Sequence, residues 1–216
     1  MKLIFFDNVN DLEQEPHDTS ELLGTKMAER FTVVQAPSIA SHDEALKSVL
    51  AAGFRPAYEF GLANVWSPSE HNYDHRAENC GLYAPRIEPA SHAWCARDAT
   101  QTPDERHYIQ FNFAQPMFAM GIATRGRGDE DQWVTVYHVM VKLAGGDWVK
   151  WRNPAAQGAL EFPGNRDRNS VQLNALAAPG QAPLVNGVRL IPKAGQEWLS
   201  MRADVIVQQP PGPRQQ

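Results

Sequence analysis

The chain has 216 residues, of which 43% are hydrophobic and 21% charged, so it carries enough apolar material for one core and is not disordered throughout. Twenty Lys and Arg against 25 Asp and Glu give a formal net charge of −5, which lacks the basic surplus of nucleic-acid-binding proteins. No apolar run is long enough for a transmembrane helix, which needs about 18 residues or more.

The first residues predict no targeting segment. Met1–Phe6 begins like a signal peptide, but Asp7 interrupts the apolar run far short of the roughly 7–15 residues that a secretory signal needs. The acidic residues that follow argue against a transit peptide. We therefore expect a cytoplasmic protein.

The cysteine content agrees with that compartment. Cys80 and Cys95 are the two cysteines of the chain, and two cysteines do not make a disulfide framework. The sequence favours two reduced thiols with a structural role over a disulfide that closes a small loop.

Residues 1–60 predict a mixed N-terminal extension. Lys2–Phe6 and Phe31–Val34 are typical of short strands, and Asp7–Thr19 is an acidic loop.

A helix is predicted near the end of the extension, at Ser41–Ala52. Ser41 and Glu44 form a capping box, and Gly53 supplies the stop. One apolar stripe consists of Leu46, Val49 and Leu50. We expect this stripe to pack on the main domain rather than on a partner, because a short helix needs packing to persist.

Residues 61–207 predict an all-β domain. Tyr108–Phe113 alternates, with Tyr108, Gln110 and Asn112 on one face and the apolar residues on the other. Further strands are expected at Trp133–Val141, at Asp147–Trp151 after the Gly145–Gly146 turn, at Val188–Ile191 and at Met201–Val207. Many short strands at regular spacing indicate an antiparallel sandwich or jelly roll. Residues 208–216, rich in Pro and Gln, predict a flexible tail.

Five stretches in order resemble the discoidin domain, also called the coagulation factor V/VIII type C domain. They are Ala93–Cys95, Tyr108–Thr124, Arg125–Tyr137, Phe162–Val171, and Val188–Pro192 with Trp198 and Ser200–Arg202. The resemblance covers about residues 60–207, and the third stretch is most similar to the slime-mould discoidin lectins.

This resemblance implies an eight-stranded jelly roll with the galactose-binding-like fold. Members of the family are non-catalytic and bind sugars, phospholipid head groups, collagen or other proteins through loops at one end of the sandwich. Here those loops are His71–Ile87, Cys95–His107 and Arg125–Gln132. The chain departs from the family in two ways. Ala203 stands where a disulfide cysteine is common, and Leu82 and Tyr83 are a poor match for apolar spikes, so membrane insertion is not expected.

The polar residues of two of these loops suit a sugar site. A pyranose offers hydroxyls in a fixed array and an apolar C–H face, so its site needs an aromatic platform and planar polar groups. The candidate ligand-binding residues are Asp74, His75, Arg86, Arg127 and Asp129. An alternative is that Arg125, Arg127, Asp129 and Asp131 pair with one another at the loop.

Other conspicuous residues have structural interpretations that we prefer. Trp94 and Trp133 are expected to pack in the core rather than to serve as sugar platforms. Asn165 and Asp167 are expected to bond the backbone of their own turn. The residues predicted to be largely buried are Trp94, Ile109, Phe111, Phe113, Ile122, Val134, Val136, Leu190 and Ile191.

The sequence indicates neither catalysis nor a cofactor. It contains no nucleophile elbow and no phosphate loop. His71, His75 and Cys80 are a poor zinc set. A structural calcium stays open, without nominated ligands.

Two functions remain. The first is a non-catalytic, lectin-like module that binds a carbohydrate or protein ligand. The alternative is an intracellular scaffold component of a larger assembly, such as a ciliary or cytoskeletal complex, that uses the fold for protein docking. Either could be a homo-oligomer.

Overall fold

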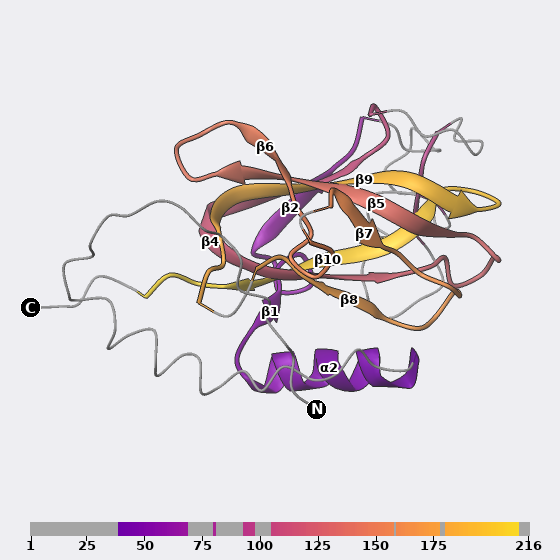
Figure 1. The fold of residues 1–216 in the computed structure, drawn as a ribbon, viewed down its shortest axis with the longest axis horizontal. Helices are drawn as coiled ribbons and strands as arrows, with labels where there is room; N and C mark the ends of the chain where they lie inside the picture. Colours follow the sequence, from indigo (N-terminus) through magenta and orange to yellow (C-terminus); the bar gives the residue numbers. More distant parts are fainter. Residues whose placement is uncertain are drawn as a thin grey trace, which may run out of the picture.

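The computed structural model describes residues 39–68, 80, 93–97, 105–157, 159–177 and 180–211, which form an all-β fold with one helix (Figure 1). Outside them lie the predicted strands at 2–6 and 31–34, the acidic loop between these strands, and residues 212–216 of the predicted tail. The elements are α2 (Ile39–Ala51), β1 (Arg55–Pro56), β2 (Ala63–Trp66), β3 (Trp94–Cys95), β4 (Ile109–Arg125), β5 (Trp133–Leu143), β6 (Trp148–Trp151), β7 (Glu161–Pro163), β8 (Gln172–Ala175), β9 (Leu184–Gln196) and β10 (Ser200–Gln208).

All the named strand pairs are antiparallel. The strand order is β1-β10-β4-β9-β5-β6, with β2 and β8 also on β4, β3 on β10 and β7 on β5. The antiparallel all-β prediction is therefore confirmed, although the described residues form ten strands where eight were expected.

The long strand β4 belongs to both layers of the sandwich. Its first half pairs with β2 and β9, whereas its second half pairs with β10 and β8. Between Asn112 and Met117 the register against β9 shifts, and residues 114–116 are exposed. Pro116 is tolerated there because a bulge needs no N–H for the ladder.

The core follows the predicted alternation. Ile109, Phe111 and Phe113 are buried, whereas Tyr108, Gln110 and Asn112 are half-buried on the opposite face. Of the residues predicted to be buried, eight are: Trp94, Ile109, Phe111, Phe113, Ile122, Val134, Leu190 and Ile191.

Val136 is the exception, since it is half-buried. Register shifts occur on both sides of it in the β5–β9 pair. As a result, the next buried residue of β5 after Val134 is Tyr137 rather than Val136. A bulge of this kind places an extra residue out of the alternation. Trp94 is fully buried as predicted, while Trp133, at the start of β5, is half-buried.

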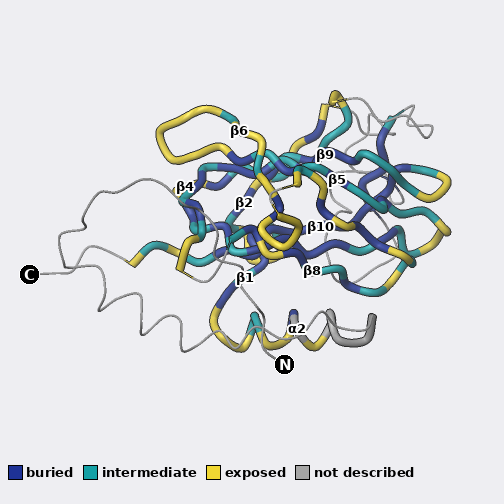
Figure 2. Tube along the Cα trace, in the orientation of Figure 1, coloured by how far each residue is buried: buried dark blue, intermediate teal, exposed yellow. Residues whose placement is uncertain are grey.

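Helix α2 packs on the outer face of the layer that contains β4, β8 and β10 (Figure 1). Leu46 lies in a cluster with Ala123, Val171 and Ile206, and Val49 and Leu50 pack against this cluster. The predicted docking of the stripe is confirmed, and the outward side of the helix is exposed (Figure 2).

The two ends of α2 compare differently with the prediction. The stop is correct: Gly53 has φ +90°, Gly53 N donates to Leu50 O and Phe54 N donates to Val49 O, which is a Schellman motif. The predicted N-cap is wrong, because the helix already begins at Ile39, two residues before Ser41.

Strand β10 is buried along almost its whole length (Figure 2). One face supplies Met201, Ala203, Val205 and Val207 to the main core. The other face is covered by α2 over Ile206, by the turn after β1 over Asp204, and by two loops over Arg202.

Candidate ligand-binding site

Residues 126–132 form the loop that connects β4 to β5, and hydrogen bonds from Arg202 hold the start of this loop. Arg202 is completely buried, and its guanidinium donates to the carbonyls of Gly126 and Arg168, each at 2.7 Å. A Cβ at position 126 would come within 2.8 Å of the Asp167 carbonyl oxygen, so only glycine fits this close approach. The loop therefore starts from a rigid base.

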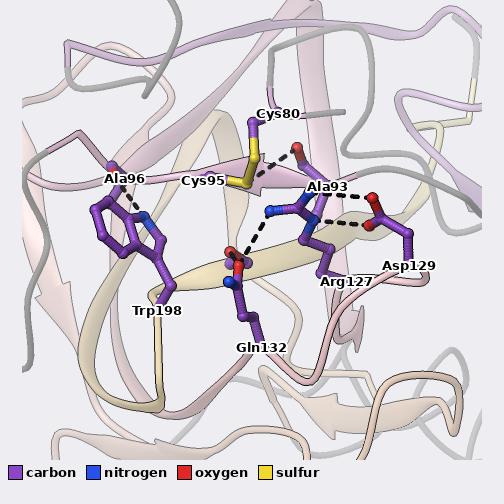
Figure 3. The surroundings of a disulfide bond; sticks show 9 residues. Cys80, Ala93, Cys95, Ala96, Arg127, Asp129, Gln132 and Trp198 are labelled. Atoms are coloured by element: carbon purple, nitrogen blue, oxygen red, sulfur yellow. Dashed lines mark hydrogen bonds and ion pairs between the residues drawn. A yellow bond between two sulfur atoms is a disulfide. The ribbon is translucent and has the colours of Figure 1, made fainter. Parts of the chain in front are cut away.

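Arg127 is the central polar residue of this loop (Figure 3). Its Nε and Nη2 donate to the two carboxylate oxygens of Asp129 at 2.7 and 3.0 Å, and its Nη1 donates to Gln132 Oε1 at 3.2 Å. The side chains of Arg127 and Asp129 are 13% and 32% exposed. A bidentate pair of this kind holds the guanidinium in one orientation.

A disulfide between Cys80 and Cys95 lies beside Arg127 (Figure 3). The prediction of two reduced thiols is therefore wrong. Cys95 of β3 pairs with Ser200 of β10. Two residues before Cys95, the backbone of Ala93 forms an isolated β-bridge with that of Cys80. Strand pairing therefore brings the two sulfur atoms together. The prediction rested on the expected cytoplasmic location, which carries no information about which strands pair.

A pocket of about 120 Å³ lies between the loop and the disulfide, lined by Cys80, Arg127, Gln132 and Trp198. Trp198 is oriented by its Nε1, which donates to Ala96 O at 2.8 Å. Gln132 is oriented by Ser200, whose hydroxyl donates to Gln132 Oε1 at 3.0 Å. These side chains come from three separated stretches of the chain.

The arrangement can present hydrogen-bond donors beside an aromatic ring. An arginine carries five N–H groups, and the contacts of Arg127 with Asp129 and Gln132 use three of them. Gln132 uses only its oxygen in the described contacts, so its amide N–H groups add further donors. With the Trp198 indole nearby, the pocket combines planar donors with an apolar wall and suits a small polyhydroxylated ligand.

The structure describes two of the five predicted ligand-binding residues, and their role in binding stays a prediction. Asp74, His75 and Arg86 lie outside the described residues. Arg127 and Asp129 do come together, and they pair with each other, as the structural alternative anticipated. Asp131 instead pairs with Arg168 at 3.3 Å.

Gln132, Trp198 and the disulfide were missed as site features. Gln132 closes the same loop as Arg127, and its position there was the available signal. Trp198 and Cys80 reach the pocket through the pairing of β3 with β10, which no local pattern encodes.

Asp167 bonds its own turn as predicted, whereas Asn165 bonds both its own turn and the end of β4. Asn165 donates to Thr124 O at 3.1 Å and to Ser170 O at 2.9 Å. Burial raises the pKa of Asp167, but hydrogen bonds from Ser170 and Asn169 outweigh it and leave the pKa below its ordinary value. Both residues stabilise the turn next to the Arg127 loop.

Among the described residues, no group of three or more His, Cys, Asp or Glu side chains is arranged to hold a metal ion. Within the same part of the chain, no helix is long and apolar enough to cross a membrane.

Residues 67–205 match the F5/8 type C domain family. The chain belongs to this family. It is 30% identical over 115 residues to discoidin-2 of Dictyostelium discoideum, an alignment that covers 51% of this chain and 41% of that protein. The match to bovine (Bos taurus) lactadherin, at 30% identity over 116 residues, covers 53% of this chain and 26% of that protein. The chain thus spans less than half the length of these relatives.

Solved structures share the fold of this F5/8 type C domain. Discoidin II of Dictyostelium discoideum superposes with a TM-score of 0.56 at 21% identity, covering 76% of this chain and 62% of that one. A module of Clostridium perfringens, solved in complex with GalNAc-β-1,3-galactose, gives a TM-score of 0.52 at 14% identity, covering 67% and 95%.

Proposed function

We propose that this F5/8 type C domain is a non-catalytic, lectin-like module that binds a galactose-type sugar in the pocket between the Arg127 loop and the Cys80–Cys95 disulfide. The observation that carries the proposal is the orientation of Arg127. Asp129 and Gln132 hold its guanidinium beside a pocket of about 120 Å³, and the contacts among the described residues leave two of its five N–H groups for a ligand.

The size and lining of the pocket support a single sugar ring rather than a long chain. Two adjacent hydroxyls of a pyranose can accept from one guanidinium, while the C–H face packs on the Trp198 indole. The similarity of fold to a module solved with GalNAc-β-1,3-galactose is the reason for choosing the galactose type.

The test is binding of galactose and GalNAc-β-1,3-galactose, measured by isothermal titration calorimetry. Arg127→Ala should weaken binding about tenfold, because charge-assisted hydrogen bonds to a shielded ligand are lost. The melting temperature should change little, because the base of the loop is held by Arg202 rather than by Arg127.

Arg168→Ala is the matched control, since Arg168 pairs with Asp131 of the same loop but does not line the pocket. This variant should keep the affinity of the wild type. A wild-type domain that binds neither sugar contradicts the proposal. So does an Arg127→Ala domain whose melting temperature falls markedly while its folded fraction keeps the wild-type affinity, because Arg127 would then have a structural role.

A further inference from the structure

Aromatic side chains and an arginine form a strip on the outer face of the layer made by β2, β4, β9, β5 and β6. The aromatic strip consists of Trp66, Tyr108, Arg189 and Trp148. Trp66 lies opposite Gln110, and Gln110 lies opposite Arg189, so the strip crosses three neighbouring strands on one face. This layer lies on the other side of the sandwich from α2 (Figure 1).

Arg189 is held between two rings. Its Cζ lies 4.0 Å from the ring centroid of Trp148 and 4.7 Å from that of Tyr108. Trp66 continues the row, with its ring centroid 5.8 Å from that of Tyr108, and it is 44% exposed. Because rings flank the guanidinium, its N–H edges are what it can offer to a ligand.

A glycine makes room for this arrangement. A Cβ at Gly187 would lie 3.2 Å from Cη2 of Trp148, so the indole reaches from β6 across to β9 and lies against the bare backbone there. The same Cβ would lie 2.7 Å from the Phe111 carbonyl oxygen, so the β4 backbone itself requires a glycine at the point where Trp148 packs.

Amide groups extend the strip. Arg189 Nε donates to Gln110 Oε1 at 2.6 Å, and Gln110 Nε2 donates to Asn112 Oδ1 at 2.6 Å. The contacts among the described residues leave the two Nη groups of Arg189 and the amide N–H groups of Asn112 available as donors. Oriented donors thus lie beside the aromatic rings, with Arg189 between Tyr108 and Trp148.

We propose that the aromatic strip is a second binding site, separate from the Arg127 pocket, and that its ligand is a linear β-1,4-linked glycan. Strands lie about 4.8 Å apart, so a row across three strands offers contacts to consecutive sugar rings of a straight chain. Sugar C–H faces pack on the indoles of Trp66 and Trp148, and hydroxyls accept from Arg189 and Asn112.

The charges of this surface are separate points and do not form a continuous basic track. Arg189 is the one cation within the strip, Lys142 of β5 lies in register between Gly187 and Trp148, and Lys150 is paired with Glu105 at 3.1 Å. Single-stranded nucleic acid would need a basic track along its phosphates. A neutral glycan needs none.

The test uses cellohexaose, chitohexaose and mannohexaose as probes for the full chain, by isothermal titration calorimetry. We expect the wild type to bind at least one of them. Trp66→Ala and Arg189→Lys should each weaken that binding about tenfold, because the first removes a platform and the second removes the stacked planar donor.

Two variants serve as controls for the hexasaccharide experiment. Phe60→Ala removes another exposed aromatic that packs on an arginine, Arg55, outside the strip, and should leave hexasaccharide affinity within twofold of the wild type. Arg127→Ala should also leave it unchanged, while weakening galactose binding.

Three results overturn the aromatic-strip proposal. The first is that the wild type binds none of the three hexasaccharides. The second is that Arg127→Ala loses hexasaccharide binding while Trp66→Ala keeps it. The third is that the wild type instead binds oligo-dT, or forms dimers through Trp66. Failure of the Arg127 pocket to bind galactose leaves this test unaffected, because the two sites have different probes and variants.

Discussion

Among the described residues, Asp204 is the carboxylate whose pKa is most strongly shifted by its surroundings. Three backbone N–H groups, those of Tyr58, Glu59 and Val205, donate to it at 2.8, 2.9 and 2.7 Å. These bonds tie the turn after β1 to the middle of β10. Burial nevertheless raises the pKa of Asp204 to about 7, because desolvation outweighs the lowering by the N–H donors.

We expect this shift to make stability depend on pH. Between the unfolded pKa near 3.8 and the folded pKa near 7, the folded state binds a proton that the unfolded state does not. The contribution of Asp204 to the free energy of unfolding is therefore full below the unfolded pKa. It falls by about 1.4 kcal/mol per pH unit across this window and levels off above the folded pKa. Urea unfolding at a series of pH values from 4 to 8 measures it.

Asp204→Asn is the comparison that isolates this residue. The variant should be less stable at pH 5, because the amide group that replaces Oδ2 cannot accept from Glu59 N. The difference in stability between wild type and variant should shrink as the pH rises. A difference that is constant across the range, or that grows with pH, contradicts the raised pKa.

At the scale of the element, the attachment of α2 rests on few side chains. Leu46 is buried among Phe54, Val171 and Ile206. Leu46→Ala should lower the free energy of unfolding by about 2–3 kcal/mol, through lost burial and the cavity left behind. Chemical denaturation measures the change, and amide hydrogen exchange in 44–51 reports whether the helix opens alone.

Ser41→Ala is a useful counterpart in the same helix. Because α2 begins at Ile39, Ser41 is an internal helical residue, and its replacement should change the stability by less than about 0.5 kcal/mol. A loss of about 1 kcal/mol would restore Ser41 as the N-cap and place the first helical residue at 42, three residues later than Ile39.

The strands were predictable where side chains alternate and not where the chain bends. The 108–113 alternation correctly assigned both faces of early β4. It could not reveal that β4 continues through Pro116 to Arg125, because proline normally ends a strand and the bulge that accepts it is a tertiary feature. Val136 was misplaced for the same reason.

The candidate site was predictable only where its residues are close in sequence. Arg127 and Asp129 pair within one loop, so the loop prediction was enough to bring them together. Trp198 and Cys95 meet that loop through the pairing of β10 with β3 and β4. Such pairing depends on the whole sheet and leaves no local signature.

At the scale of the whole molecule, the disulfide links stability to the pocket. Replacing both Cys80 and Cys95 by Ser should cost about 3 kcal/mol, the entropy expected for a loop of this length, whose ends are 15 residues apart. Galactose binding should weaken as well, because Cys80 forms part of the pocket wall. Thermal melting and calorimetry check the two effects.

The control for the disulfide is the wild type in dithiothreitol. It should match the double Ser variant in both measurements, whereas hexasaccharide binding by the aromatic strip should persist in both. A reduced protein with unchanged galactose affinity would show that the pocket does not depend on the covalent link.

The position of β10 has a consequence for how the protein is made. Among the described strands β10 comes last along the chain, yet it pairs with β1, β3 and β4 and is covered on both faces. A ribosome must therefore deliver Gln208 through its exit tunnel before the nascent chain can close its core. Until then, the edge of β4 and the apolar face of α2 are not covered by β10. During these seconds of synthesis the exposed surface favours binding of chaperones and self-association.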